Sequence, residues 1–405
     1  MDAAAACRKI SSLEELLAPV EPALFFRDYF GSKPLHIPGS PERFSYLLNW
    51  QALNRLLSSM HGGPNFRLVR AGKDIPPERY LVRHRSWLSQ VALLDLGALS
   101  RELTDGATIT INAFEQMHEP VSDLCRVLEL ALSNYVDVVA FAGWHSSQAF
   151  RTHWDHEDVF ILQTVGKKHW RLFPNERPHP TVADLQVKFN PTSQTPYWEG
   201  DLVAGDLLYI PSGWWHDVTS VAGETIHVSF GCEFPTGLDL AQQIVARLSR
   251  YESLRTTLPR YKSNAEQREY MVLFRQAVQE ITQELKLEDF FRDADAKAPA
   301  RGRLSLPWSA APQSQAPPLP ADAWIHWLPP RSASLTRSDD ELCLEALGRT
   351  LKFSAAAAPV LQDLMSCRRT QVHALCARFP NTTIDQFIVH LATSGLVAIA
   401  TDSSI

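Results

Sequence analysis

The stretch RTHWDHEDVFILQTVGKKHWRLF, residues 151–173, decides how this sequence folds. It contains two runs of β-branched, aromatic and leucine residues on either side of a Gly-Lys pair, which is the pattern of a β-hairpin. Similar short runs lie before and after it, separated by clusters of Gly, Pro, Asn and Ser: VDVVAFAG (136–143), DLLYIP (206–211) and TIHVSFGCEF (225–234). Closely spaced strands with no helices between them predict an antiparallel sandwich or barrel of the jelly-roll kind.

The chain on both sides of these strands predicts helices. Before residue 134, amphipathic helical runs at 13–26 and 50–60 alternate with short strand-like pieces at 35–38 and 107–111. After Pro235 the apolar spacing becomes helical, in one run over 240–248 and in another over 271–285. Two or three helices are therefore expected to follow the β core.

The last third of the chain predicts a separate unit. Residues 297–322 are rich in Pro, Ala and Ser, which predicts a linker. Helical runs at 360–367 and 384–395 and a closing apolar strand at 396–400 are compatible with a winged helix. We therefore expect a β core with an N-terminal helical elaboration over 1–234, a helical region over 235–296, a linker over 297–322 and a winged-helix-like domain over 323–405.

Composition and charge argue against several classes of protein. The 405 residues carry a formal net charge of -6, which is unlike a protein that mainly coats nucleic acid, although it leaves room for a local basic patch. The six cysteines are scattered without a C-x-x-C pair, which argues against a zinc ribbon or a disulfide scaffold and favours a reducing compartment. Charges interrupt the N-terminal stretch, and no later stretch is long and apolar enough to span a bilayer. We therefore expect a cytoplasmic protein with no membrane partner.

Three residues form a candidate metal site. His153 and Asp155 are two positions apart, so both side chains point to one face if this stretch is an extended strand. His-x-Asp alone is a weak pattern, but His216 follows an apolar strand and a Pro-Ser-Gly turn that would deliver a second imidazole to a barrel mouth. Two imidazoles and one carboxylate leave iron with three open positions, as an oxygenase requires for a bidentate cosubstrate and dioxygen. A structural zinc site would more typically offer four ligands that include thiolates.

Lys168 is a candidate for binding an anion. Strand alternation places it on one face with Trp170 and Leu172, while His169 and Arg171 point the other way. A cation on an apolar, inward face is costly unless it is paired, so an anionic ligand would explain it. The alternative is that Lys168 ends the turn in solvent and that Trp170 is partly exposed.

The motifs together resemble one family, the JmjC ribosomal oxygenases. The resemblance rests on H-x-D at 153–155, VFILQ at 159–163, G-x-K-x-W-R at 166–171 and G-D-x-L-Y-I-P-x-G-x-x-H at 205–216. The order and the spacing both fit. FFRDYFGSKPLHI at 25–37 also resembles the amino-terminal segment of the family, and the helical middle and winged-helix end match its domain order.

This resemblance implies a fold, cofactors and residue roles. It implies a mainly β core, a double-stranded β-helix or jelly-roll cupin of JmjC type, with a helical dimerisation region and a C-terminal winged helix. His153, Asp155 and His216 would bind Fe(II), and Lys168 would bind the distal carboxylate of 2-oxoglutarate, the cosubstrate used with O2. Three further residues would line the site in contact with the cosubstrate or behind its ligands, namely Gln163, His227 and Ser229.

The resemblance also implies partners. A homodimer is expected, together with a protein or peptide substrate that is most simply a ribosomal protein hydroxylated at the β-carbon of arginine or histidine. Direct nucleic-acid binding is not expected. The alternatives are the same chemistry on a biosynthetic peptide or on N-methyl-lysine, and a metal-binding cupin regulator without catalysis.

Other polar residues near these motifs have structural explanations. His156 is expected to face away from His153, the acidic pair Glu157 and Asp158 suits a turn, and Asp206 is expected to bond to its own turn. Trp214 and Trp215 suit packing as well as substrate stacking. The approach from Trp144 to Arg151 departs from the family pattern and is expected to border the substrate.

Overall fold

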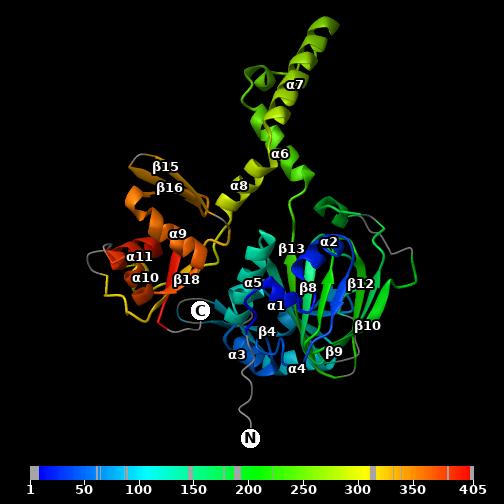
Figure 1. Cartoon of the computed structure of the whole chain (residues 1–405). Helices are drawn as coiled ribbons and strands as arrows, with labels where there is room; N and C mark the ends of the chain where they lie inside the picture. The colour runs from blue at the N-terminus through cyan, green and yellow to red at the C-terminus, as the bar shows by residue number, and fades with distance from the viewer. Residues whose placement is uncertain are drawn as a thin grey trace. The chain divides into compact units, whose positions relative to one another are not determined.

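The computed structural model divides the chain into two compact units, residues 1–234 and 235–405, and each is described by itself (Figure 1). The structure describes residues 9–60, 63, 65–85, 87, 90–144, 149–176, 178–186, 193–221, 223–310, 316–331, 333–338, 340–380 and 383–401. Among these residues, no helix combines the length and the apolar character needed to cross a membrane.

Unit 1 is built on an eight-stranded antiparallel sheet with strand order β1-β11-β8-β13-β7-β6-β2-β3. The strands in this order are Leu35–Ile37, Leu207–Ile210, Asp158–Val165, Thr225–Cys232, Asp137–Gly143, Thr108–Ile111, Phe66–Arg70 and Lys73–Asp74. Strands β8 and β13 are central and almost wholly buried, because both faces of the sheet are covered. This explains why their sequences are nearly continuous apolar runs.

A second antiparallel sheet has the order β10-β9-β12 and faces the first. Its strands are Trp198–Val203, Lys167–Phe173 and Trp215–Ser220. Apolar side chains of the two sheets pack together in one cluster, which includes Val159 and Ile161 of β8 and Trp170 and Leu172 of β9. The two sheets therefore form the predicted antiparallel sandwich.

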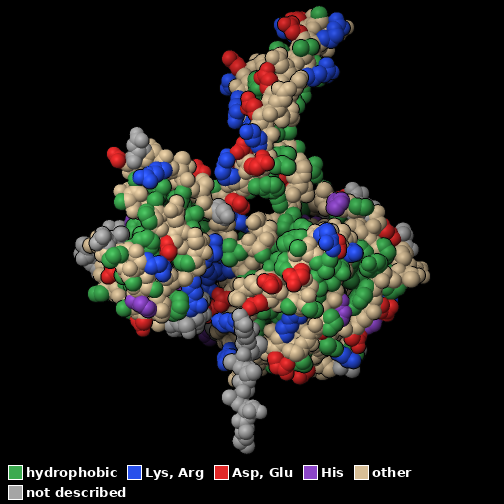
Figure 2. Space-filling model, in the orientation of Figure 1, with side chains coloured by type: hydrophobic (Ala, Val, Ile, Leu, Met, Phe, Trp, Pro, Cys, Tyr) green, Lys and Arg blue, Asp and Glu red, His purple; other side chains and the backbone are tan. Residues whose placement is uncertain are grey.

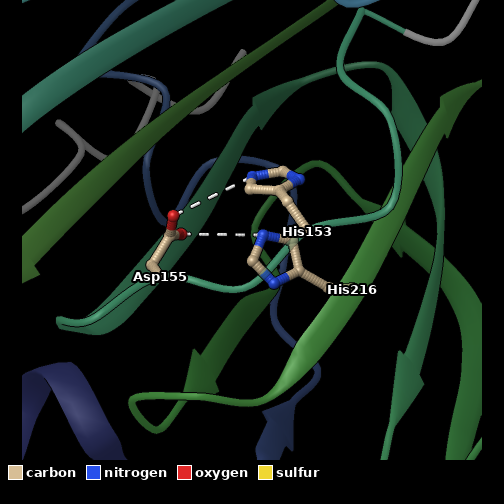
Figure 3. A group of neighbouring side chains, drawn as sticks. All are labelled: His153, Asp155 and His216. Atoms are coloured by element: carbon tan, nitrogen blue, oxygen red, sulfur yellow. Dashed lines mark ion pairs between the residues drawn. The ribbon is translucent and has the colours of Figure 1, made fainter. Parts of the chain in front are cut away.

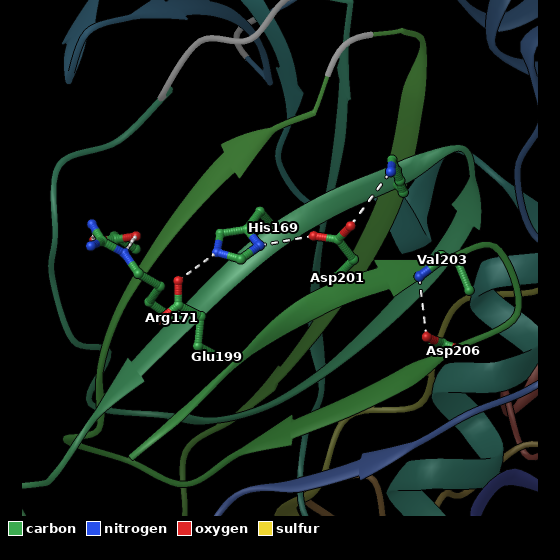
Figure 4. Close-up of polar contacts among 8 residues, drawn as sticks. His169, Arg171, Glu199, Asp201, Val203 and Asp206 are labelled. Carbon is green, nitrogen blue, oxygen red and sulfur yellow. Dashed lines mark hydrogen bonds and ion pairs between the residues drawn. The ribbon is translucent and has the colours of Figure 1, made fainter. Parts of the chain in front are cut away.

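The outward face of the smaller sheet carries charged side chains (Figure 4). His169 lies between two carboxylates of β10, with Nδ1 2.8 Å from Asp201 and Nε2 3.0 Å from Glu199. These two contacts raise the pKa of His169, Asp201 having the larger effect. The alternation predicted for β9 is confirmed, because Lys168, Trp170 and Leu172 are buried while the intervening side chains face outward.

Helices cover the other face of the large sheet. They are α1 (Leu13–Leu17), α2 (Pro22–Asp28), α3 (Trp50–Met60), α4 (Leu96–Thr104) and α5 (Glu119–Leu132). Leu16 and Leu128 from this layer share one core with Phe160, Tyr209 and Phe230 of the sheet. Unit 1 also contains a two-stranded hairpin, β4 (Leu81–Arg85) with β5 (Gln90–Leu94).

The single helix predicted over 13–26 is wrong. The chain forms two helices there, because Pro19 lacks the N–H that a continuing helix needs and Pro22 starts the next helix at a position where proline is favoured. The helix predicted over 50–60 is confirmed as α3.

Unit 2 begins with three helices, α6 (Gly237–Leu248), α7 (Asn264–Glu284) and α8 (Leu287–Lys297). Capping boxes start the first two, formed by Thr236 with Asp239 and by Ser263 with Glu266. Hydrophobic side chains reach the surface along α6 and α7, among charged ones (Figure 2).

The rest of unit 2 has its own hydrophobic core between helices and two small sheets. The sheets have the orders β18-β14-β19 and β15-β16-β17, and the helices are α9 (Ala358–Cys367), α10 (Val372–Arg378) and α11 (Ile384–Thr393). The strands are β14 (Trp324–Trp327), β15 (Ser334–Ser338), β16 (Glu341–Ala346), β17 (Arg349–Ser354), β18 (Arg369–Gln371) and β19 (Val397–Ala400). Within the preceding 297–322 segment, Leu319 joins this core and the Ser305 hydroxyl accepts a bond from the Ile399 N–H at 2.9 Å. Ser305 and Leu319 are therefore packed against this unit, while Leu304 and Leu306 of the same segment are exposed.

Candidate metal centre and its cavity

The backbone around His153 is fixed against strand β12. His153 and His216 form an isolated antiparallel bridge, in which the His153 N–H donates to the His216 carbonyl at 3.0 Å and the His216 N–H donates to the His153 carbonyl at 2.7 Å. The Asp155 carbonyl accepts a bond from the Gly213 N–H at 2.8 Å. The strand expected around 153–155 does not form, and only His153 makes a β-bridge. This bridge nevertheless brings the two imidazoles together.

The three candidate ligands converge on one point (Figure 3). One atom from each of His153, Asp155 and His216 lies within 4.8 Å of the others. Asp155 Oδ1 lies 3.9 Å from His153 Nε2, and Asp155 Oδ2 lies 3.6 Å from His216 Nε2. Among the described residues this is the one group of His, Cys, Asp and Glu that is close enough to hold a metal ion.

Hydrogen bonds at the far side of each ring orient the imidazoles. Nδ1 of His153 is 2.8 Å from the Arg151 carbonyl, and Nδ1 of His216 is 3.1 Å from the Trp214 carbonyl. A carbonyl only accepts, so Nδ1 carries the proton in both rings and the Nε2 lone pairs point to the centre. Burial, with a smaller effect of His153, lowers the pKa of His216 to about 4 and so favours the neutral form that binds metals. The residues present thus fit a divalent ion held by two nitrogens and one oxygen on one side.

The triad opens into a cavity of about 610 Å³. The strand register gives this cavity two ends, because His227 and Phe141 are paired across β13 and β7, while Gly231 and Asp137 are paired four positions further along. All four residues line the cavity. The end near His227 is called the inner end here, and the end near Gly231 the outer end.

The inner end contains a buried amine without a counter-charge. The Lys168 side chain is only 4% exposed, and its Nζ lies 5.8 Å from the centre of the Phe141 ring. In the part of the chain that the structure describes, no carboxylate forms an ion pair with Lys168, and burial lowers its pKa to about 7. The predicted inward orientation is confirmed, and the solvent-exposed alternative is wrong.

His227 also belongs to the inner end. Its ring stacks on Phe141, with centres 4.6 Å apart, and its Nδ1 has no hydrogen-bond partner among the described residues. Burial, and to a lesser extent Lys168, lowers the pKa of His227. An amine and an imidazole that both lack partners make this end suited to an anionic group.

The structure separates the other two predicted lining residues. Ser229 lines the cavity. Gln163 is fully buried but is not part of the cavity wall, since its amide donates to Thr225 Oγ1 at 2.7 Å and to the Val165 and Ile226 carbonyls. Gln163 thus ties β8 to β13 behind the site.

Sequence reasoning missed the charged residues of the outer end. Glu157 lines the cavity, and its carboxylate lies against Gly231. A Cβ added to Gly231 would be only 2.7 Å from Glu157 Oε2. Asp137, which is paired with Gly231, lines the same end. The sequence predicts a turn for Glu157 and its neighbour Asp158, and the pattern gives no sign that Glu157 reaches the cavity. The proximity of Asp137 to Glu157 depends on strand register, which the sequence does not reveal.

The remaining polar neighbours have structural roles. His156 points to Glu233, 3.6 Å away, and Asp158 accepts bonds from the Tyr209 hydroxyl and the Ser212 N–H. Asp206 accepts from the Val203 N–H of its own turn at 3.1 Å, as expected (Figure 4). Trp214 and Trp215 are buried and are not part of the cavity wall. Of the approach from 144 to 151, residues 145–148 lie outside the described residues, while Ala149 and Phe150 line the cavity.

Comparison with known proteins identifies the fold around this site. Residues 112–240 match the family model for the JmjC domain. A solved structure of YcfD, a ribosomal oxygenase from Escherichia coli, superposes with a TM-score of 0.57 over 94% of this chain and 98% of that one, at 18% identity. Residues 112–240 therefore resemble a JmjC domain in sequence and in fold, and the predicted jelly-roll core of JmjC type is confirmed.

More than half of the chain is similar in sequence to proteins named as ribosomal oxygenases or histidyl-hydroxylases, as its motifs indicated. It is 25% identical over 222 residues to the bifunctional lysine-specific demethylase and histidyl-hydroxylase NO66 of Dictyostelium discoideum, covering 54% of this chain and 42% of that protein. It is 25% identical over 260 residues to ribosomal oxygenase 2 of Rattus norvegicus, covering 62% and 54%. The chain thus spans about half the length of these curated relatives.

Replacing Lys168 with methionine should stabilise the ligand-free protein. The pKa of the buried Lys168 amine is about 7 in the folded state and 10.5 in the unfolded state. The folded state therefore binds fewer protons between these two pH values, and Lys168 lowers the stability most below pH 7. We expect Lys168→Met to raise the free energy of unfolding of unit 1 by roughly 2 kcal/mol or more at pH 7, and the gain to shrink as pH rises toward 10. Urea unfolding at several pH values measures this.

The neighbouring Lys167 provides the control. It is exposed and pairs with Asp201 at 3.5 Å, so Lys167→Met should change stability little at any of these pH values. A wild type as stable as Lys168→Met at pH 7 would show that the ammonium has a partner and would remove the argument for an anion site.

Proposed function

We propose that this protein is an Fe(II)- and 2-oxoglutarate-dependent oxygenase that hydroxylates a protein side chain. One observation supports this most strongly. The His153, Asp155 and His216 triad opens into the same cavity as the buried, uncompensated Lys168. A metal centre with open positions beside an anion-binding amine suits a cosubstrate that carries two carboxylates.

Each side chain has a role in this proposal. His153, Asp155 and His216 would hold Fe(II), and Lys168 would pair with the distal carboxylate of 2-oxoglutarate, with His227 in the same end of the cavity and Ser229 between the two ends. Iron, 2-oxoglutarate and O2 together supply the oxidant that places one oxygen atom on a C–H bond. Phe141 and Trp170 make the inner end apolar, which excludes water and strengthens the pairing of Lys168 with an anion.

Similar proteins support this chemistry. A solved YcfD structure contains cobalt and 2-oxoglutarate, and the curated relatives are named as a bifunctional lysine-specific demethylase and histidyl-hydroxylase and as a ribosomal oxygenase. We therefore propose arginine or histidine of a ribosomal protein as the substrate, hydroxylated at the β-carbon. Asp137 and Glu157 support a cationic side chain, because they place two carboxylates at the outer end of the cavity, whose wall also contains Arg67.

The remaining parts of the chain fit this proposal. We propose residues 1–234 as the catalytic domain, 235–296 as a dimerisation region, 297–322 as a connection and 323–405 as a winged-helix-like domain, in a cytoplasmic protein. Helix α11, Ile384–Thr393, contains no Lys or Arg, which supports the expectation that it does not bind nucleic acid. Exposed apolar residues on α6 and α7 support a homodimer, among them Val245, Met271, Val272 and Leu273.

The metal and cosubstrate proposal is tested without oxygen. Fe(II) and then 2-oxoglutarate are added anaerobically, and a weak visible charge-transfer band should appear with the wild type and not with His216→Ala. His156→Ala, altered beside the triad but outside it, should keep the band. Absence of the band in a folded wild type would refute the oxygenase.

The substrate is tested by intact-mass comparison of ribosomal proteins from cells with and without this protein. We expect one ribosomal protein to lose the mass of a single oxygen atom when the protein is missing, with fragmentation placing that atom on an arginine or histidine. If the band appears but no ribosomal protein changes, the alternatives are a biosynthetic peptide or N-methyl-lysine. If the band and the mass shift are both missing, a non-catalytic metal-binding regulator remains.

The homodimer is tested by placing a charge on α7. Val272 is 57% exposed, so Val272→Glu should leave the fold intact while separating a wild-type dimer into monomers in analytical ultracentrifugation. Val182→Glu is the control, because Val182 is 54% exposed in unit 1. A wild type that sediments as a monomer would contradict the dimer.

A further inference from the structure

Asp217 is a buried carboxylate directly next to a candidate metal ligand. It follows His216 on β12, so alternation turns it to the outward face of the smaller sheet, yet its side chain is only 3% exposed. Burying a carboxylate is unfavourable unless it is paired and hydrogen-bonded. Its partners therefore show which parts of the fold it holds together.

Arg171 is the main partner of Asp217. The two residues are directly opposite each other in the β9–β12 register. Arg171 Nε donates to Oδ1 at 3.0 Å and Nη2 donates to Oδ2 at 2.6 Å, which is a bidentate, charge-assisted pair. This fork fixes the direction of the Asp217 carboxylate.

The second partner lies on the segment that carries the other imidazole. The Thr152 hydroxyl donates to Asp217 Oδ2 at 3.4 Å, and Thr152 immediately precedes His153. One carboxylate thus links the residue before His153 to the residue after His216. It lies behind the backbone bridge that pairs these two histidines.

We infer that Asp217, held by Arg171, is a positioning residue for the metal centre. It keeps the 151–153 segment against β12, so that the two imidazoles stay at one separation and orientation. His153 depends on this support because its segment has only one bridging residue and is not part of a sheet. The inference rests on the proposed metal-dependent function and deepens it.

The neighbouring ion pairs on the same face provide a contrast. Asp201 and Glu199 also contact a β9 side chain, His169, but their side chains are 39% and 50% exposed, and they join β9 to β10. Neither strand carries a ligand of the triad. Asp201 is therefore a matched control, being an acidic residue of the same sheet face with no connection to the two histidines.

The test measures metal binding by the full chain without cosubstrate. Mn(II) affinity is measured by titration, and the visible spectrum of bound Co(II) reports the ligand geometry. We expect Asp217→Asn to weaken Mn(II) binding about tenfold or more and to change the Co(II) spectrum. Arg171→Gln should act in the same direction, and Thr152→Val by a smaller factor. Asp201→Asn should stay within about twofold of the wild type.

Arg171→Gln keeps the test decisive if Asp217→Asn does not fold, since the Arg171 side chain is 45% exposed and its loss leaves no cavity in the core. Folded variants with a lower melting temperature but wild-type Mn(II) affinity and Co(II) spectrum would overturn the inference, because they would show a purely structural role. A wild type that binds neither metal would overturn the proposed function as well. The two failures are thus distinguishable.

Discussion

Two backbone hydrogen bonds between His153 and His216 hold the candidate metal centre together. The chain before His153 is not a strand, so this bridge is what places its imidazole beside strand β12. The Gly213 N–H then fixes Asp155 from the adjoining turn, and carbonyls of Arg151 and Trp214 orient the rings. Main-chain hydrogen bonds therefore place the ligand-bearing segments, and the Asp217 side chain supports the segment that carries His153.

The hairpin of β8 and β9 explains how much of the site the sequence predicts. Period-two alternation is a local property, so it places Lys168 with Trp170 and Leu172 on the inner face without knowledge of the rest of the fold. Spacing likewise selects His153 and Asp155, and the apolar strand before the Pro-Ser-Gly turn selects His216. These residues could be chosen from the sequence because short-range rules determine their direction.

Other features depend on partners far along the chain, and the sequence does not predict them. The sequence did not predict strands β10 and β12, because WEGDLV and WHDVTS are short and mix polar with apolar residues. The pairing of Arg171 with Asp217, and the proximity of Glu157 to Gly231 and Asp137, follow from register between strands. For Gln163 the sequence leaves two positions open, in contact with the cosubstrate or behind its ligands, and its hydrogen bonds hold it behind the cavity wall.

The buried polar groups of unit 1 fall into two kinds, those with hydrogen-bond partners in the fold and those without. Asp158, Asp206 and Asp217 are all buried, and each accepts at least two hydrogen bonds from neighbouring elements. The fold therefore satisfies buried carboxylates that connect its parts. Lys168 and the Nδ1 atom of His227 are equally buried but have no such partners in the described chain, and both face the cavity beside the triad. Since leaving a buried polar group unpaired is unfavourable, their persistence there is best explained by a ligand that supplies the missing anion.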